Sequence, residues 1–367
     1  MESLSVSQNK QDILLMLATL ALVTVGTAMI YSSSAIMATE RFHDAQYFLK
    51  RQIVFVVLGL VLMYLLARFP YQKLKIAAYP ALVVSFVMLL ALFVPSVGKK
   101  VGGAVRWLNL GFIAFQVAEW VKVSLVLFLA LFLTRKRQYI KEITRGILAP
   151  LVVAACLMGL IILQPDFGTT AIIAVTVMFM LYLAGARIVH LLGLVGIFTP
   201  FLIWALCQGY RWKRVTAFMD PWQDPHGTGF QIIQSMIAFG SGGPVGVGIG
   251  DGMQKLFYLP EPHTDFILSV IAEESGFLGV SVVILLYTVL IVRGFLISFR
   301  APDLFGMLLA AGLTILIFMQ VFINIAGVMG LIPLKGLTLP FLSYGGTSLM
   351  MSLAIIGILL NISSQEA

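Results

Sequence analysis

The sequence has few charged residues, two cysteines and four histidines. Charged side chains make up 11% of its 367 residues, whereas about a quarter of the residues in a soluble globular domain are charged. Hydrophobic residues make up 60%, and this composition excludes an ordinary water-soluble domain. Cys156 and Cys207 both lie within apolar runs, so they provide neither a disulfide framework nor a metal-ligand spacing. The composition therefore indicates a membrane protein.

Long apolar runs recur along the whole chain. Because a membrane-spanning helix needs about 20 apolar residues, these runs predict ten helices with mostly short connections. The runs cover residues 13–36, 51–68, 75–94, 117–134, 146–163, 169–186, 188–207, 265–292, 303–329 and 341–361. The first run is long for a signal peptide and lacks an A-x-A cleavage site, so we expect it to be retained. We expect an all-α polytopic membrane protein in which residues 1–367 form a single transmembrane domain.

Basic residues in the short loops indicate the orientation of this bundle. On one side the loops carry Arg68, Lys73, Lys75, Arg135, Lys136, Arg137, Lys141, Arg145, Arg187, Arg293 and Arg300. Cytoplasmic loops are enriched in Lys and Arg, so we expect this side, and both chain termini, to be cytoplasmic.

The loops on the opposite side carry about as many basic residues. This does not follow the rule that Lys and Arg are enriched in cytoplasmic loops. They are Arg41, Lys50, Arg51, Lys99, Lys100, Arg106, Arg211, Lys213, Arg214, Lys255 and Lys335. Lys50 and Arg51 are explained by side chains that reach lipid headgroups at the interface. For the others, a bound polyanion is the competing explanation. The net charge of +8 does not indicate a nucleic acid partner, because the basic residues are scattered between apolar runs.

The loops on this second side are the longer ones, and residues 208–264, between the seventh and eighth helices, form the longest. Within it, residues 229–240 predict an amphipathic helix lying on the membrane surface. Residues 240–252 (GSGGPVGVGIGDG) could pass for a phosphate-binding loop, but they lack a preceding strand and a Lys-Ser/Thr pair. We expect tight turns and close backbone approach instead, with N–H groups that could still contact a pyrophosphate.

Asp265 lies where this long loop meets an apolar run. Thr264 is the predicted N-cap, since Pro260 and Pro262 disfavour helix before it. A carboxylate in the first helical turn is explained either by the helix dipole, worth about 0.3–1 kcal/mol, or by a catalytic role. Both explanations stay open on this segment alone.

Polar residues also interrupt the predicted helices. Glu119 and Lys122 are three residues apart, so they either pair with each other or line a polar pathway, and we favour the pathway. Ser269 and Glu273 continue a polar stripe from Asp265 along one helix face. We expect Glu273 and Glu274, as well as Gln320 and Asn324, to bond to neighbouring helices.

Several motifs together resemble the SEDS family of bacterial shape, elongation, division and sporulation proteins. They are YSSSA at 31–35, the segment at 102–122, QPDFGTT at 164–170, the segment at 214–235, GSGGPVGVGIGDGMQKLFYLPEPHTDFI at 240–267 and LIPLKGLTLPFLSYGGTS at 331–348. The resemblance covers essentially the whole chain and is closer to the division branch than to the elongation branch. Pro244 departs from the larger apolar residue expected there, which puts nothing catalytic in doubt.

The resemblance implies the ten-helix SEDS fold and the activity of a peptidoglycan glycosyltransferase. Such an enzyme polymerises lipid II on the outer face of the bacterial cytoplasmic (inner) membrane during septal cell-wall synthesis. The implied partners are a class B penicillin-binding transpeptidase of the FtsI type, other divisome membrane proteins and membrane lipids. No cofactor is expected with certainty, and a divalent cation (Mg²⁺ or Mn²⁺) is an alternative.

The resemblance also implies the site residues. Its essential aspartate falls on Asp265, the candidate general base for deprotonating an acceptor sugar hydroxyl. By similarity, further substrate-binding positions are Arg106, Glu119, Lys122, Asp166, Lys335 and Ser343. His263 and Thr264 flank the aspartate, and Arg211 and Arg214 add positive charge for a pyrophosphate.

Three other functions stay open. A lipid II flippase also suits ten helices with intramembrane charges, an elongation-type polymerase shares the chemistry, and a noncatalytic scaffold would not need Asp265. Glu261, His263 and Asp265 alternate along the chain and could gather around a metal, but their spacing is not a recognised ligand pattern, so we assign no metal ligand.

Overall fold

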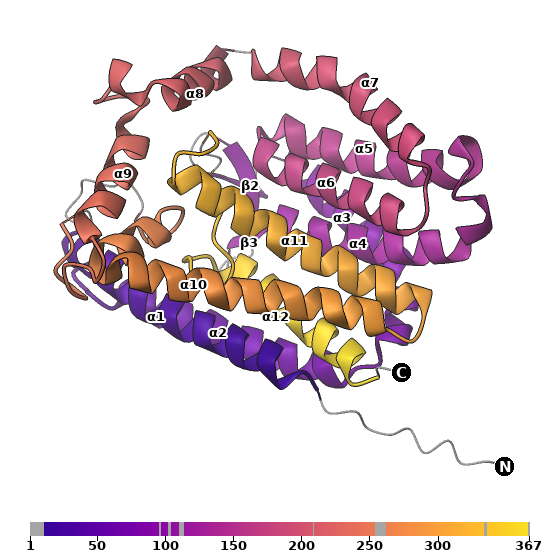
Figure 1. Cartoon of the computed structure of the whole chain (residues 1–367), viewed down its shortest axis with the longest axis horizontal. Helices are drawn as coiled ribbons and strands as arrows, with labels where there is room; N and C mark the ends of the chain where they lie inside the picture. Colours follow the sequence, from indigo (N-terminus) through magenta and orange to yellow (C-terminus); the bar gives the residue numbers. More distant parts are fainter. Residues whose placement is uncertain are drawn as a thin grey trace.

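The structure is a computed structural model that describes residues 11–94, 97–101, 104–109, 114–207, 209–253, 262–333 and 336–365. Long helices form most of it (Figure 1). The helices are α1 (Ile13–Phe42), α2 (Tyr47–Arg68), α3 (Leu74–Ala91), α4 (Val117–Arg135), α5 (Leu148–Leu163), α6 (Phe167–Leu183), α7 (Ile188–Leu206), α8 (Gly209–Met219), α9 (Phe230–Gly242), α10 (Ile267–Arg300), α11 (Leu304–Val328) and α12 (Gly346–Ser363). The short helices are η1 (Tyr71–Lys73), η2 (Arg137–Tyr139), η3 (Ile143–Ile147) and η4 (Pro221–Gln223).

Each predicted membrane run contains one long helix. In the described part of the chain, eight helical segments are long and apolar enough to cross a membrane, and α6 and α7 are shorter apolar helices. The long helices α1, α2, α10 and α11 lie roughly parallel or antiparallel (Figure 1). We call the end of the bundle where α10 and α12 begin the Asp265 end, and the opposite end, where α1 begins and α12 ends, the termini end.

The centre of the bundle is formed by α4, α11 and α12. In the most apolar 18-residue stretch of each, 78%, 72% and 89% of the residues are buried, against 17% for α2. An apolar helix that is buried on all sides lies inside a bundle, whereas one exposed over most of its surface faces lipid. The polar residues of α4 and α11 therefore lie in the protein interior.

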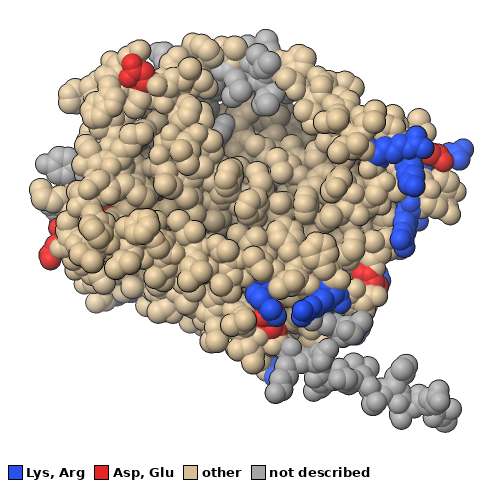
Figure 2. Space-filling model, viewed as in Figure 1, with Lys and Arg blue, Asp and Glu red and all other residues tan. Residues whose placement is uncertain are grey.

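Helix α7 contributes little to this core. Its residues Ile188, Val189, Leu192 and Ile197 are exposed. Among the α7 residues whose side chains are described, Leu191 is buried against the bundle. In Figure 1, α7 and α8 form an arch along one side, and Figure 2 shows the surface hollowed below that arch. Helix α8 lies in the connection of residues 208–264, where no helix was predicted at its position.

The all-α expectation is wrong in one segment. Strands β1 (Gly98–Val101), β2 (Ala104–Asn109) and β3 (Ala114–Gln116) form an antiparallel sheet in the order β1-β2-β3, where a loop was expected. Backbone N–H and C=O groups near the membrane need partners, and pairing three short strands supplies them. Strand β3 ends at Gln116 and α4 begins at Val117, so the sheet fixes the N-terminus of that central helix.

The helix predicted at 229–240 exists as α9, but its polar face does not point outwards. Ser235 is fully buried and its hydroxyl lies 2.8 Å from that of Ser269 on α10, while Met236 and Ile237 are exposed. Ser235 also donates to the carbonyl of Val328 at the end of α11. Because these hydrogen bonds join α9 to α10 and α11, α9 is packed against the bundle. The prediction of a helix that only lies on the membrane surface does not describe these contacts.

Helix α10 is broken at Gly276, which has φ 63° and ψ −162°. A break removes helical hydrogen bonds, and the glycine-rich segment of residues 243–248 replaces them. Val247 and Gly248 donate to the carbonyls of Glu273 and Glu274 at 3.0 and 3.1 Å. In return, the N–H groups of Phe277 and Leu278 donate to the carbonyls of Gly243 and Pro244 at 2.9 and 3.1 Å.

This exchange explains the glycine-rich sequence. A Cβ on Gly246 would lie 2.2 Å from the carbonyl oxygen of Glu274, and one on Gly276 would lie 2.3 Å from the nitrogen of Gly246. The expected close backbone approach is therefore confirmed. The N–H groups of Val247 and Gly248 are used within the protein, so the expectation that they could contact a pyrophosphate is wrong for this part of the segment.

We predict that Gly246→Ala lowers the thermal unfolding midpoint of the detergent-purified protein. Gly246 has φ 84° and no space for a methyl group, so the substitution should cost roughly 1–3 kcal/mol. The matched control is Gly240→Ala, since a Cβ there meets no atom within 4 Å. Equal midpoints for the two variants would contradict the packing of this segment into α10.

Candidate functional site

Asp265 lies in a turn before α10, not within its first helical turn. The helix begins at Ile267 with Phe266 as N-cap, and Phe266 makes no side-chain capping bond, so the prediction that Thr264 caps the helix is wrong. The side-chain amide of Asn324 on α11 donates to the carbonyl oxygen of Asp265 at 3.0 Å. This bond from a neighbouring helix holds the turn. Because Asp265 precedes the first helical turn, the dipole explanation for its carboxylate is weaker.

The segment of residues 336–345, which we call the anchoring loop, lies against this turn. Asn324 also donates to the carbonyl of Leu337 at 2.5 Å, so one buried amide joins the turn and the loop. The N–H of Tyr344 donates to the carbonyl of His263 at 2.8 Å. A Cβ built on Gly336 would lie 3.3 Å from Oδ2 of Asp265, which places the loop backbone beside the carboxylate. Asp265 itself is partly exposed.

The anchoring loop is buried among the central helices. Tyr287 on α10 donates a hydrogen bond to the carbonyl of Pro340. A Cβ on Gly26 of α1 would lie 2.5 Å from the carbonyl oxygen of Phe341. Ser343, predicted as a substrate-binding residue, is 3% exposed and accepts a hydrogen bond from the N–H of Leu339 at 2.8 Å. The structure therefore gives Ser343 a role inside the loop, and substrate contact stays a prediction.

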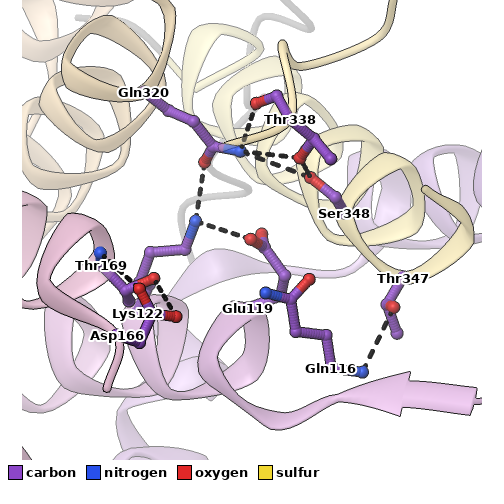
Figure 3. Close-up of polar contacts among 9 residues, drawn as sticks. All are labelled: Gln116, Glu119, Lys122, Asp166, Thr169, Gln320, Thr338, Thr347 and Ser348. Carbon is purple, nitrogen blue, oxygen red and sulfur yellow. Dashed lines mark hydrogen bonds and ion pairs between the residues drawn. The ribbon is translucent and has the colours of Figure 1, made fainter. Parts of the chain in front are cut away.

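A second network joins the loop to α4 (Figure 3). Lys122 donates to Oε1 of Glu119 at 2.9 Å and to Oε1 of Gln320 at 2.6 Å. The amide of Gln320 donates to the carbonyl of Thr338 at 3.0 Å, and Thr338 donates to Ser348 at 3.0 Å. Glu119 and Lys122 are 6% and 4% exposed, so they form a buried pair held within the bundle.

Asp166 and Arg106 meet at the start of α6. Asp166 caps this helix, because its carboxylate accepts from the N–H and the hydroxyl of Thr169 at 3.1 and 3.0 Å. Arg106 on β2 donates to the carbonyls of Gln164 and Pro165 at 3.2 and 2.6 Å. Its Nε lies 3.9 Å from Oδ2 of Asp166, at the outer limit of an ion pair.

This corner also reaches the anchoring loop. A Cβ on Gly168 would lie 3.1 Å from the Leu337 side chain. The N–H of Gln116, at the end of β3, donates at 3.3 Å to the hydroxyl of Thr347 in α12, directly after the loop. The structure thus brings Asp265, Asp166, Glu119 and Lys122 to helices and turns that contact one loop.

His263 is packed between aromatic rings. Its ring centroid lies 4.4 Å from that of Phe48 and 5.5 Å from that of Tyr344. Burial, with a smaller contribution from the positive charge of Arg41, lowers the pKa of His263 to about 4. The imidazole is therefore neutral at physiological pH, and it supplies no positive charge for an anionic substrate.

The structure does not describe the side chains of three basic residues that were predicted to bind substrate. Lys335 lies outside the described residues, between α11 and the anchoring loop, and its neighbour Gly336 approaches Asp265. Arg211 and Arg214 belong to α8, whose backbone is described while their side chains are not. Their contacts with a substrate stay predictions. Thr264 lies beside Asp265 in the same turn and is partly exposed.

The donor set around Asp265 does not form a complete metal cage. Within the described ranges, no group of three His, Cys, Asp or Glu side chains could hold a metal ion, and Glu261 lies outside those ranges. A divalent cation here would need ligands from a bound substrate and from water, as is common for Mg²⁺ at phosphate sites.

The other polar residues of the helices are hydrogen-bonded within the protein. Glu274 accepts from Ser32 on α1 at 2.7 Å, and Glu273 accepts from the N–H of Met253 at 2.8 Å. Gln320 and Asn324 both connect α11 to other segments. The expected bonds to neighbouring helices are confirmed for Gln320 and Glu274. Asn324 instead donates to the Asp265 turn and the anchoring loop, and Glu273 accepts from a loop residue.

Sequence reasoning missed the anchoring contacts of Gly336, Thr338 and Tyr344. One signal for them is present in the sequence. Leu337, Leu339, Phe341 and Leu342 make this segment apolar although Pro340 interrupts a helical pattern, and all four are buried. An apolar segment that cannot be helical indicates a loop inside the protein.

Comparison with known proteins places this arrangement in a family. The model of the FTSW_RODA_SPOVE family, described as "Cell cycle protein", matches residues 12–367. The chain belongs to this family. With its eight apolar helices of spanning length in the described part, this family member is a multi-pass membrane protein, and the resemblance to SEDS proteins is confirmed.

Curated relatives match over nearly their whole length. The chain is 45% identical over 354 residues to "Probable peptidoglycan glycosyltransferase FtsW" of Trichlorobacter lovleyi, covering 96% of this chain and 93% of the relative. It is 41% identical over 362 residues to "Stage V sporulation protein E" of Bacillus subtilis, covering 98% and 99%. Division and sporulation names thus both occur among its relatives.

Solved structures share the fold. A chain from the structure titled "Structural coordination of polymerization and crosslinking by a peptidoglycan synthase complex" matches with a TM-score of 0.79 and 32% identity, covering 96% of this family member and 97% of that chain. The rod shape determining protein RodA of Thermus thermophilus matches with a TM-score of 0.70 and 29% identity, covering 96% of each chain.

We predict that Lys122→Met destabilises the protein and that Glu119→Leu in the same chain restores much of the loss. A lone buried Glu119 carboxylate should cost about 3–5 kcal/mol, whereas replacing both charges can be nearly neutral. Thermal unfolding of the two single variants and the double variant measures this coupling. A Lys122→Met protein as stable as the parent, with its activity lost, would instead support the polar pathway that the sequence favoured.

Proposed function

We propose that this protein is a peptidoglycan glycosyltransferase that polymerises lipid II. The observation that carries the proposal is its 45% identity, over 96% of its own length, to a relative named as a probable enzyme of this kind. The geometry supports it, because the predicted catalytic carboxylate lies in a fixed turn at one end of a membrane bundle.

The proposed topology has ten spans. The eight long apolar helices cross the membrane together with α6 and α7, which are apolar but shorter. The termini end faces the cytoplasm, because the loops there carry the basic residues expected inside. The Asp265 end is then extracytoplasmic, and residues 208–264 form its longest connection. A lipid-anchored sugar can reach Asp265 there while its tail stays in the bilayer.

In the proposed reaction, the carboxylate of Asp265 takes the proton from an acceptor sugar hydroxyl. The hydroxyl oxygen forms a bond to the anomeric carbon of the donor with inversion. The bond from that carbon to the undecaprenyl pyrophosphate oxygen breaks, and the leaving group keeps the electron pair. A base must come within about 2.6–3.2 Å of the group that it deprotonates, and the partly exposed Asp265 can be reached by such a group.

Positive charge near the leaving pyrophosphate would stabilise the transition state, usually the largest contribution to catalysis. Arg106 is the described candidate, since 28% of its side chain is exposed while two loop carbonyls orient its guanidinium. Arg211, Arg214 and Lys335 are further candidates from sequence. Lys122 is buried in its pair with Glu119, so we propose that it supports the site from within the bundle rather than at the pyrophosphate.

We propose no resident cofactor. A divalent cation, Mg²⁺ or Mn²⁺, would be bound chiefly by the substrate pyrophosphate and water, where it would neutralise negative charge. The steps above require only residues of the chain.

The proposed role is septal, because the division name recurs among the relatives. The proposed partner is a class B penicillin-binding transpeptidase of the FtsI type. The similarity to a chain from a complex described as coordinating polymerization and crosslinking supports this partner. Other divisome membrane proteins are proposed on the resemblance alone. An elongation-type polymerase is the nearest alternative, since RodA shares the fold.

A lipid II flippase is the alternative from a different class. Transport requires that both membrane faces be reached by a polar pathway. Here the charged pair of α4 is closed by hydrogen bonds to Gln320, which favours an enzyme with one open face. Vesicles with labelled lipid II separate the two, because transport without polymerisation would support the flippase.

We predict that Asp265→Asn abolishes glycan polymerisation from lipid II by the purified protein with its transpeptidase partner. The amide is nearly the same size but cannot act as a base at neutral pH, so the rate should fall by at least about 100-fold, the lower range for loss of general base catalysis. Product length on gels measures the outcome.

The matched control is Asp251→Asn, which changes an exposed aspartate outside the site and should leave the rate unchanged. Glycan chains of near-normal amount from a folded Asp265→Asn protein would reject the proposed base. They would favour the scaffold or the flippase instead.

A further inference from the structure

The connection between α4 and α5 is strongly basic. Residues 135–145 contain Arg135, Lys136, Arg137, Lys141 and Arg145, against one carboxylate, Glu142. The single ion pair, between Arg145 and Glu142, is 3.9 Å long and exposed, so it contributes little. Figure 2 shows Lys and Arg gathered at the right edge of the molecule, where Figure 1 places this connection.

The connection is folded rather than extended. Ile140 is 3% exposed and anchors it to the bundle. The N–H of Glu142 donates to the carbonyl of Tyr139 at 2.9 Å, and the N–H of Gly146 donates to that of Glu142 at 3.1 Å. A Cβ on Gly146 would lie 2.2 Å from the carbonyl oxygen of Tyr139, so η3 packs closely on η2. The basic side chains therefore project from a defined backbone.

These side chains line a hollow of about 600 Å³, formed by Arg135, Arg137, Gln138 and Lys141. No carboxylate is among the described residues that line it. Two other cations at the termini end are paired, since Arg293 binds Asp12 at 2.6 Å and Lys75 binds Asp303 at 3.0 Å. Within the part of the chain that the structure describes, Arg137 and Lys141 have no such partner. We call this feature the basic hollow.

Apolar surface continues directly from the basic hollow. The guanidinium of Arg135 lies 5.9 Å from the ring centroid of Tyr79 on α3. On the α5 side, Ile143 and Leu148 are about half exposed. Val83 on α3 and Val152 on α5 are exposed further along the same helices. A ligand here meets positive charge at one end and lipid-facing helix surface at the other.

We propose that the basic hollow binds the phosphate headgroup of an anionic glycerophospholipid, with its acyl chains lying along α3 and α5. Three cations and an amide match a phosphodiester that accepts several hydrogen bonds. Basic pockets between membrane helices are known to suit such headgroups. A soluble phosphate would use the cations but gain nothing from the adjoining apolar surface.

The cations also fit the general enrichment of basic residues in cytoplasmic loops. That rule concerns the number of charges near the membrane and does not require that three of them surround one hollow. The binding proposal predicts instead that their position decides lipid affinity. It does not depend on the proposed glycosyltransferase activity.

The test is native mass spectrometry of the detergent-purified protein titrated with phosphatidylglycerol or phosphatidylcholine. Phosphatidylglycerol should bind at least tenfold more tightly. The triple variant Arg135→Gln, Arg137→Gln, Lys141→Gln should lose most of that preference. The control triple Arg68→Gln, Lys73→Gln, Arg187→Gln removes the same charge from the same end and should change the affinity less than twofold.

Two outcomes would overturn the proposal. Equal losses in both triple variants would mean that net charge alone attracts the lipid. Full displacement of phosphatidylglycerol by millimolar inorganic phosphate would mean that the basic hollow is a phosphate site without a lipid component. Circular dichroism of each triple variant checks that it is folded, and thermal stabilisation by phosphatidylglycerol gives a second readout on the same proteins.

Discussion

The structure depends on one constraint, which is that non-helical backbone inside a membrane bundle must find hydrogen-bond partners within the protein. The anchoring loop meets it through Asn324, Tyr287 and an internal bond to Ser343. The break in α10 meets it through the glycine-rich segment, which exchanges four backbone hydrogen bonds with the helix. The bonds of Asn324 and Tyr344 that hold the anchoring loop also reach the turn that carries the carboxylate.

This coupling links packing to the proposed chemistry. Asn324 binds the carbonyl of Asp265 and the carbonyl of Leu337, so the aspartate cannot move independently of the loop. Gln320, one turn earlier on α11, connects the loop to the buried pair of α4. A catalytic base is effective only when its position is held, and here the position is held by interior helices. Asp265 is partly exposed, as the proposed reaction requires.

The long helices could be predicted from the lengths of the apolar runs in the sequence. Most contacts between segments far apart in the chain could not. The long helices and the bonding of Gln320 and Asn324 could be expected, because polar groups in apolar helices need partners. The sheet could not, because its strands have only 4, 6 and 3 residues. The start of α10 could not, because it depends on contacts of the Asp265 turn with α11 and the anchoring loop. Asp265 was found by its place before an apolar run and by family resemblance, whereas its clamp by Asn324 needed the structure. The cations at Lys335, Arg211 and Arg214 remain predictions from the sequence.

The most direct test of this account is hydrogen exchange of the Asp265 turn. Asn324→Ala removes two hydrogen bonds from a buried amide, worth about 1–3 kcal/mol in all, and exchange at residues 262–268 should rise about tenfold. Asn361→Ala is the control, because Asn361 clamps the carbonyl of Ala67 and the N–H of Tyr71 at the opposite end. It should leave the Asp265 turn unchanged. Unchanged exchange in Asn324→Ala, or an equal rise in both variants, would contradict the claim that Asn324 holds the carboxylate in place.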